Sequence, residues 1–283
     1  MNDLQKVELD ILKNFIEICD RLNLRYYLVC GSALGAAKYK GFIPWDDDID
    51  VALPRQDYDV FCKKAQSMLP DYLFLQNHHT DTYYPLIFSK IRNNNTTFIE
   101  KSYAETNINH GIYIDVFPLD GYPEDVRWQK KIEKEKNRYL LMRLCCLNVP
   151  LTWKTKLLVA LEKTCGVHKR PSTLVERIEK CVKLCSVDDS VVWCNHGNWQ
   201  GQLEYAPREQ YGEGAWTEFE GLQVRIPERF DEYLTQKYGD WRSDPPERER
   251  VGHHYHYICD TNLPYTKFVE VISKRKIKIK SDS

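Results

Sequence analysis

The sequence has little net charge and no long apolar segment. Its 283 residues carry 40 Lys and Arg against 41 Asp and Glu, which gives a formal net charge of −1. Such a balance lacks the global positive field of many nucleic-acid-binding proteins, so we expect no nucleic-acid partner. No apolar run approaches the roughly 20 residues that cross a membrane. The length allows one large domain or two modest ones, with a sizeable hydrophobic core.

The opening residues also lack the features of an export signal. The stretch MNDLQKVELD has neither the basic nor the apolar region of a signal peptide, so we expect a cytoplasmic protein with reduced cysteines. Four residues, Cys181, Cys185, Cys194 and His196, offer a zinc site as an alternative to core positions. Their C-x3-C-x8-C-x-H spacing differs from the common zinc patterns, and we favour core positions.

Hydrophobic periodicity predicts three regions along the chain. Strands interleaved with helices predict an α/β (α+β) fold, with a catalytic sheet core over 1–123. A helical region over 124–190 follows, and a C-terminal lobe over 191–283 completes the same cleft. The expected helices are 3–22, 33–39, 55–69, 124–147, 151–164 and 172–185, and the expected strands are 25–30, 49–53, 72–76, 85–92 and 111–117.

The stretch GFIPWDDDID, residues 41–50, concentrates aspartates where mutual repulsion is costly without a cation. Side chains alternate along a strand, so Asp48 and Asp50 should share one face, and Asp46 joins them if the extended geometry reaches back. Such a pair of carboxylates can chelate a hard cation such as Mg²⁺. A solvated acidic loop would not explain the alternation with apolar residues. The calcium-loop pattern is not met, because the glycine that it requires is missing.

Two further features indicate phosphate chemistry. Gly31 and Ser32 follow a predicted strand and open a helix, where backbone N–H groups favour anions. Asp115 in GIYIDVFPLD lies mid-strand among apolar residues, where a lone charge is expensive. A metal shared with Asp48 and Asp50 would compensate it, and a buried Lys or Arg is the alternative. The sequence therefore predicts a Mg²⁺ (or Mn²⁺) site built from these carboxylates.

The segment GSALGAAKYKGFIPWDDDIDVALPRQDY, residues 31–58, resembles the hallmark segment of the LicD family. That family includes bacterial phosphocholine transferases and is similar to fukutin-type ribitol-phosphate transferases. Three further blocks match, SKIRNNNT (89–96), GIYIDVFPLDG (111–121) and YGDWRSDPPERERVGHHYHY (238–257), whereas the helical middle matches poorly. The resemblance implies a nucleotidyltransferase-like mixed sheet with flanking helices.

The resemblance also implies an activity. The expected reaction is Mg-dependent transfer of a phosphoalcohol from a CDP-activated donor to a hydroxyl of a glycan, with release of CMP. Phosphocholine is the default group, and the acceptor would be a cell-surface or lipid-linked glycan such as lipopolysaccharide, teichoic acid or capsule. In such an enzyme Asp48 and Asp50 would hold the metal, and Asp115 would complete the site or act as general base.

Residues near the matching blocks become candidates for binding the donor. Lys90 and Arg92 share a strand face and rank first among the basic residues. Lys38 stands where family members often carry Arg, and a lysine cannot make the two-pronged phosphate contact of an arginine. Tryptophans in these blocks would stack a base, bind a choline-like cation or pack the cleft floor. The full set is Gly31, Ser32, Lys38, Trp45, Arg55, Lys90, Arg92, Trp241, His253 and His254.

Other functions and partners remain open at this point. A nucleotidyltransferase would use an NTP on a small molecule and release pyrophosphate, and a non-catalytic glycan- or nucleotide-binding module would need no turnover. Residues 151–170 are basic and amphipathic, and Lys274–Lys280 are cationic, which fits a peripheral contact with the inner membrane surface. A packed helix and a charged edge strand are the alternatives for these two segments.

Overall fold

A seven-stranded mixed sheet organises the computed structural model, which describes residues 1–148, 150–165, 171–197, 201–252 and 254–280. The strand order is β1-β2-β6-β4-β3, with β7 paired to the far end of β6 and β8 paired to β7. β2 and β6 run parallel, and the other neighbours are antiparallel. The strands are β1 (Tyr27–Leu28), β2 (Asp50–Pro54), β3 (Leu73–Gln76), β4 (Ser89–Asn93), β6 (Ile112–Tyr122), β7 (Val192–Cys194) and β8 (Tyr205–Pro207). The fold is therefore mixed α/β, as predicted.

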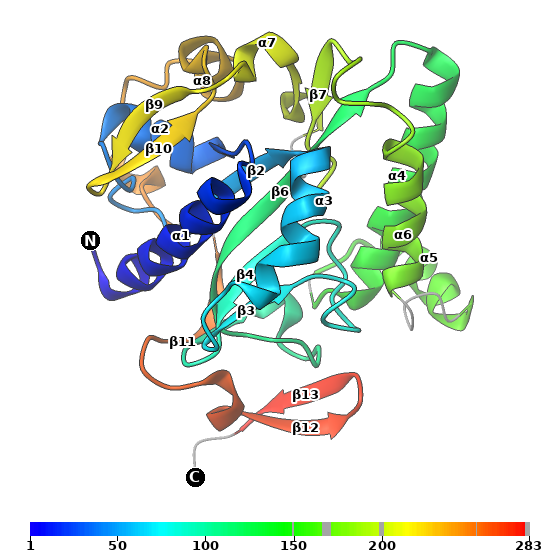
Figure 1. Cartoon of the computed structure of the whole chain (residues 1–283). Helices are drawn as coiled ribbons and strands as arrows, with labels where there is room; N and C mark the ends of the chain where they lie inside the picture. Colours follow the sequence, from blue (N-terminus) through cyan, green and yellow to red (C-terminus); the bar gives the residue numbers. More distant parts are fainter. Residues whose placement is uncertain (149, 166–170, 198–200, 253, 281–283) are drawn as a thin grey trace.

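Helix α1 (Asp3–Leu22) and helix α3 (Arg55–Lys64) lie across one face of this sheet (Figure 1). α1 buries Ile11, Leu12 and Phe15 completely, and burial of each such side chain stabilises the fold by about 1.5–3 kcal/mol. Its N-cap is Asn2, and Gln5 completes a capping box. The long apolar stripe of α1 thus covers the sheet that carries the aspartates.

Three helices form a separate group beside the sheet: α4 (Val126–Cys146), α5 (Trp153–Cys165) and α6 (Pro171–Val182) (Figure 1). They confirm the predicted helices of the middle region to within a few residues. None of the helices in the described ranges is long and apolar enough to cross a membrane.

The C-terminal third returns to the sheet core in two places. β7 extends the sheet at β6, and β11 (His256–Asp260) pairs with β5 (Thr97–Glu100). Between them lie α7 (Arg208–Tyr211), the β9 (Ala215–Phe219) and β10 (Leu222–Ile226) hairpin, and α8 (Phe230–Tyr238). A last hairpin, β12 (Val269–Ser273) and β13 (Lys276–Ile279), follows β11. The domain boundaries predicted at 123 and 190 fall just before α4 and β7, and they stay predictions.

Some predicted strand ends differ from the structure. The expected strand over 25–30 shortens to two residues, because Cys30 has a φ of 51° and begins α2 (Cys30–Lys38). Strand β2 begins at Asp50, so Asp48 lies on the approach to the strand rather than within it. Of the two aspartates predicted to alternate along one strand, only Asp50 therefore lies within β2.

Candidate active site

Three neighbouring strands bring their charged side chains together at one end of the sheet. The parallel register of β2 and β6 places Asp50 beside Asp115, and the antiparallel register of β4 and β6 places Lys90 beside Asp115. Lys90 Nζ lies 2.8 Å from Asp115 Oδ1. Asp115 thus has the buried lysine partner that the sequence left open as an alternative to a shared metal.

A cavity of about 1290 Å³ opens over this end of the sheet. All four predicted acidic ligands reach its wall, together with most of the predicted donor-binding residues. Helix α4 also contributes to the wall through Arg143, and the segment after α8 contributes through Asp244. The predicted residues that line the cavity are Gly31, Lys38, Trp45, Asp46, Asp48, Asp50, Lys90, Asp115, Trp241 and His254.

The aspartates of the cavity form a cluster with more negative charge than its surroundings compensate. Burial, and then the charges of Asp48 and Asp47, raise the pKa of Asp46 to about 8. Burial also raises the pKa of Asp48 and of Asp50, and for Asp50 the charges of Asp48 and Asp115 add to the effect. Half-buried carboxylates held together in this way are a donor set that fits a hard dication such as Mg²⁺.

His254 supplies a positive charge beside this cluster. Asp47 accepts hydrogen bonds from the backbone N–H of His254 and from its Nδ1, both at 3.1 Å, and Asp48 Oδ2 lies 3.7 Å from the same Nδ1. Burial alone would lower the pKa of His254, but the Asp47 hydrogen bond and the Asp48 charge raise it to about 10. The imidazole is therefore protonated at neutral pH and faces the carboxylates as a cation.

The compact ligand set in this region differs from the predicted one. The ligand atoms of Asp47, Asp48 and His254 all lie within 4.8 Å of one another. Within the described part of the chain, Asp48, Asp50 and Asp115 do not form such a set. Asp47 orients His254 toward the cavity by accepting hydrogen bonds from it.

Comparison with known proteins assigns part of the chain to a family. The LicD/FKTN/FKRP nucleotidyltransferase domain matches residues 23–143, which include Asp46, Asp48, Asp50, Lys90 and Asp115. The lipopolysaccharide cholinephosphotransferase LicD of Haemophilus influenzae is 29% identical over 274 residues, covering 90% of this chain and 96% of that protein. Residues 23–143 of this chain therefore form a LicD-type domain.

Shorter matches concern uncharacterised proteins. One from Rickettsia typhi is 32% identical over 62 residues, which is 19% of its length, and one from Rickettsia prowazekii is 34% identical over 47 residues, which is 18% of its length. The matched LicD domain ends within α4, so Trp241 and His254 lie beyond it. The cavity is therefore shared between the LicD domain and the C-terminal segment.

The glycine and the serine that open α2 position the aspartates of the LicD domain. A Cβ at Gly31 would lie 2.8 Å from Asp46 Oδ2, so a side chain there would displace Asp46. Ser32 Oγ accepts a hydrogen bond from the backbone N–H of Asp50 at 2.8 Å. Ser32 is buried and does not line the cavity, so it holds the start of β2 rather than facing a donor.

Arg92 does not take the place that its strand face predicted. It is fully buried, and its guanidinium donates hydrogen bonds to Gln76 Oε1, to the Gly111 carbonyl at 2.7 Å and to Glu100 Oε2 at 3.2 Å. Lys90, on the same face, reaches the cavity. Arg92 therefore does not line the cavity and instead supports it from beneath, because the sheet and β5 enclose its end of the strand.

Arg55 is also misplaced by the sequence prediction. It follows β2 at the end opposite to Asp50 and donates two hydrogen bonds to Asp120, at 2.6 and 2.8 Å. It also faces Asp59 and Glu179. Arg55 follows Asp50 by five positions, a distance of roughly 16 Å along an extended chain. Arg55 therefore belongs to a buried ion-pair cluster and not to the cavity.

The two predicted tryptophans and Lys38 line the mouth of the cavity with partners already in place. The guanidinium of Arg250 lies 5.3 Å from the ring centre of Trp45. Trp241 is 8% exposed and donates its indole N–H to Asp231 at 3.0 Å. Lys38 Nζ pairs with Asp244. His253, also predicted to bind the donor, lies outside the described residues.

Two glutamates near the LicD site escaped sequence reasoning. Glu8 on α1 is 2% exposed, and burial together with the charges of Asp48 and Asp47 raises its pKa well above the usual value. Its spacing of four residues from Leu4 and from Leu12 was a readable signal of its buried position. Burial alone would raise the pKa of Glu100, but the charges of Lys90 and Arg92 lower it to about 2.

The alternative zinc ligands do not gather into one site. Cys194 Sγ lies 3.6 Å from His196 Nδ1, whereas Cys185 contacts Ser190 Oγ and Cys181 lies on α6. Across the described residues, the clusters with metal-ligand geometry contain none of these four side chains.

Proposed function

We propose that this phosphotransferase with a LicD-type domain moves phosphocholine from CDP-choline to a hydroxyl of a lipopolysaccharide-type glycan and releases CMP. The similarity to the Haemophilus influenzae enzyme along nearly its full length supports the group and the acceptor class. The observation that carries the proposal is the cluster of half-buried aspartates on the wall of a cavity large enough for a nucleotide and a glycan hydroxyl.

The cavity residues have distinct parts in this proposal. Asp48, Asp50 and Asp46 would hold Mg²⁺ (or Mn²⁺), which supplies neutralisation of the donor diphosphate. Lys90 and protonated His254 add positive charge on the same wall. The acceptor oxygen bonds to the phosphorus of phosphocholine, the bond from that phosphorus to the CMP oxygen breaks, and the acceptor proton passes to a carboxylate.

Asp115 has two possible parts, and its contact with Lys90 bears on both. It would either complete the ligand set or accept the proton of the acceptor hydroxyl. Asp115→Asn separates the two: loss of Mg-dependent CDP-choline binding indicates a ligand, whereas loss of turnover with binding retained indicates a base. Lys90→Met serves as the comparison, because it removes the ammonium and leaves the carboxylate.

Ligand binding measured by thermal shift tests the donor assignment. A ligand that binds the folded state raises the melting temperature by mass action. CDP-choline, CDP-ribitol, CDP-glycerol, CTP and ATP would each be added with and without Mg²⁺. A Mg-dependent shift with CDP-choline, absent in Asp48→Asn, is the expected result, and a shift with another CDP-alcohol alone would replace choline as the transferred group.

A nucleotidyltransferase acting on an NTP is the second candidate, because the matched domain is described as a nucleotidyltransferase. It predicts a shift with CTP or ATP and release of pyrophosphate rather than CMP. No shift with any of these nucleotides would favour a non-catalytic binding module.

We also propose a peripheral contact with the membrane surface through α5. Trp153, Leu157, Leu158 and Leu161 are between 52% and 72% exposed, and Lys154, Lys156 and Lys163 lie on the same helix. An apolar stripe with flanking lysines suits an anionic interface, where a lipid-linked acceptor would lie. The other basic segment forms the charged hairpin strand β13, with Ile277 buried, which matches its edge-strand alternative.

A further inference from the structure

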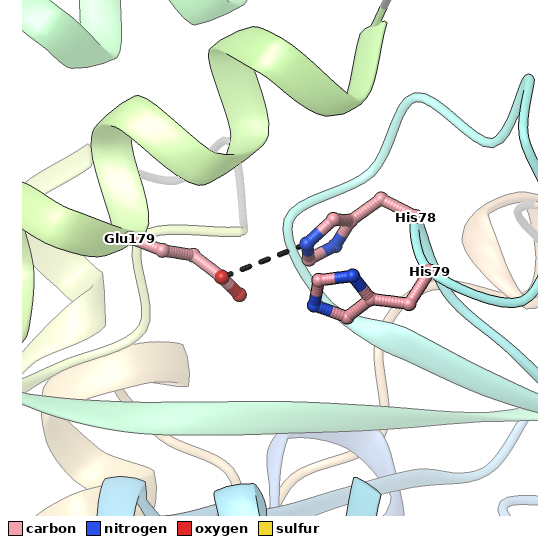
Figure 2. Close-up of side chains that lie close together, drawn as sticks. All are labelled: His78, His79 and Glu179. Atoms are coloured by element: carbon pink, nitrogen blue, oxygen red, sulfur yellow. Dashed lines mark ion pairs between the residues drawn. The ribbon is translucent and has the colours of Figure 1, made fainter.

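A second cluster of ligand-type side chains lies away from the cavity (Figure 2). His78 and His79 come from the loop after β3, and Glu179 comes from α6. Their ligand atoms all lie within 4.8 Å of one another. Figure 2 shows both imidazoles and the carboxylate turned toward a common point. None of the three side chains lines the cavity of the aspartates.

The inner histidine of this cluster has an unmet polar atom. His78 is 8% exposed, and its Nε2 is buried without a hydrogen-bond partner in the described structure. The nearest carboxylate oxygen, Glu179 Oε2, is 3.7 Å away, too far for a hydrogen bond. A buried polar atom without a hydrogen bond destabilises the fold unless a ligand satisfies it. Burial, and then the charge of His79, lower the pKa of His78 to about 3, so the ring is neutral and keeps a lone pair for a ligand.

The charges around the cluster leave room for a cation. Three carboxylates, those of Asp59, Asp120 and Glu179, face two cations, Arg55 and Lys183, at distances between 2.6 and 4.0 Å. Three negative charges against two positive ones leave a surplus of one negative charge. Arg55 is already held by two hydrogen bonds to Asp120, so it does not fully neutralise Glu179.

We propose that His78, His79 and Glu179 bind a zinc ion that links the loop after β3 to α6. Imidazole nitrogen and carboxylate oxygen are common zinc ligands, and two histidines with one carboxylate leave a fourth position for water. Glu179 is the only ligand from the helical group, and both histidines come from the sheet core. The ion therefore cross-links α6 to the core, at a place independent of the proposed transfer reaction.

Zinc affinity of the full-length protein tests this site. Competition with a chromophoric chelator in excess Mg²⁺ keeps the aspartate cluster occupied while zinc is titrated. One zinc per chain is expected, and His79→Gln should weaken binding by at least about tenfold, since even losing an outer partner of a zinc ligand costs that much. His79 is exposed, so this variant is expected to fold. Equal zinc binding by wild type and His79→Gln would overturn the proposal.

Cobalt substitution and a cysteine variant identify the ligand atoms. Co²⁺ in a nitrogen and oxygen site gives visible d–d bands without the near-ultraviolet charge-transfer band of thiolate ligands. Cys181→Ser, two residues from Glu179 on the same helix, should leave zinc affinity unchanged, and Glu179→Gln should reduce it. A thiolate band, or loss of binding in Cys181→Ser alone, would assign the metal to cysteines and reject this site.

Discussion

Strand β2 has charged side chains at each end, a half-buried group of aspartates at its start and the buried Arg55–Asp120 ion pair at its end. At its start, Asp50 joins Asp46 and Asp48 in a group whose pKa values rise because of burial and then because of the charges of neighbouring carboxylates. At its end, Arg55 makes two hydrogen bonds to Asp120, and both side chains are almost fully buried. A buried ion pair in which the protein supplies both charges stabilises the fold. A half-buried surplus of negative charge instead requires a cation, a proton or a charged ligand to neutralise it.

The largest expected effect comes from breaking the Arg55–Asp120 ion pair at the end of β2. Arg55→Met leaves Asp120 buried and unpaired, which should lower the free energy of unfolding by about 3–5 kcal/mol in chemical denaturation. Asp59→Asn is the matched control: Asp59 also contacts Arg55, but its side chain is 43% exposed, so a loss below about 1 kcal/mol is expected. Unchanged stability of Arg55→Met with lost CDP-choline binding would return Arg55 to the donor site.

A substitution in the aspartate cluster at the start of β2 should lower catalysis rather than stability. Asp48→Asn removes a proposed metal ligand and should lower kcat by roughly 10²–10³-fold, the scale for removing one electrostatic group that acts in the transition state. Its melting temperature should stay equal or rise, because repulsion among the aspartates falls. Asp71→Asn, an exposed site outside the cavity, should leave both unchanged. Full activity of Asp48→Asn would reject the metal-site mechanism.

Helix α5 differs from both ends of β2 because its exposed feature is an apolar stripe rather than a group of charges. Leu157→Glu places a charge in the exposed stripe and should weaken binding to anionic vesicles by about tenfold or more, because burying one leucine contributes about 1.5–3 kcal/mol. Vesicle co-sedimentation would measure it. Leu184→Glu, at an exposed leucine outside α5, is the matched control. If both variants bound vesicles as well as wild type, α5 would not be the membrane contact.

The pH dependence of stability separates the two ends of β2 again. The pKa of Asp46 rises from 3.8 to about 8 on folding and that of His254 from 6.5 to about 10, so between pH 7 and 9 the folded chain binds more protons than the unfolded chain. Stability in chelator should therefore fall as pH rises through this window, by at most about 1.4 kcal/mol per pH unit for each group.

Thermal unfolding at pH 7, 8 and 9 would measure this slope. Asp46→Asn should flatten it, and saturating Mg²⁺ should do the same by holding the carboxylates ionised. His110→Gln should keep it, because burial lowers the pKa of His110 to about 4, below the window. A wild-type slope of zero or of opposite sign would mean that the aspartate cluster is already neutralised by the protein.

Sequence reasoning succeeded where a local pattern carries the information. The amphipathic spacing of residues 3–22 determines α1, and the concentration of aspartates in 46–50 is costly in any fold, so it marks a site without further knowledge. Asp115 could be singled out for the same reason, as a charge within an apolar strand. Glu8 gave the same signal without being predicted, because it is a charged residue within the apolar stripe of α1.

Lys90 and Arg92 mark the limit of such reasoning. Their side chains lie two residues apart on the same face of β4, yet only Lys90 lines the cavity. Arg92 is enclosed by Gln76, Gly111 and Glu100, which come from three separate segments of the chain. Which of two equivalent positions faces a ligand depends on what covers each end of the strand, and that cover is assembled from distant sequence.

The sequence by itself determined that this protein has a mixed α/β fold and a local concentration of aspartates, because periodicity and charge repulsion act within a few residues. Only the tertiary structure decided which basic groups approach that cluster. His254 follows the matched LicD domain in the sequence and hydrogen-bonds Asp47, whereas Arg55 hydrogen-bonds Asp120 and does not line the cavity. Electrostatic interactions depend on distance in space, and pairs 65 or 207 residues apart in sequence become neighbours only after the sheet has formed.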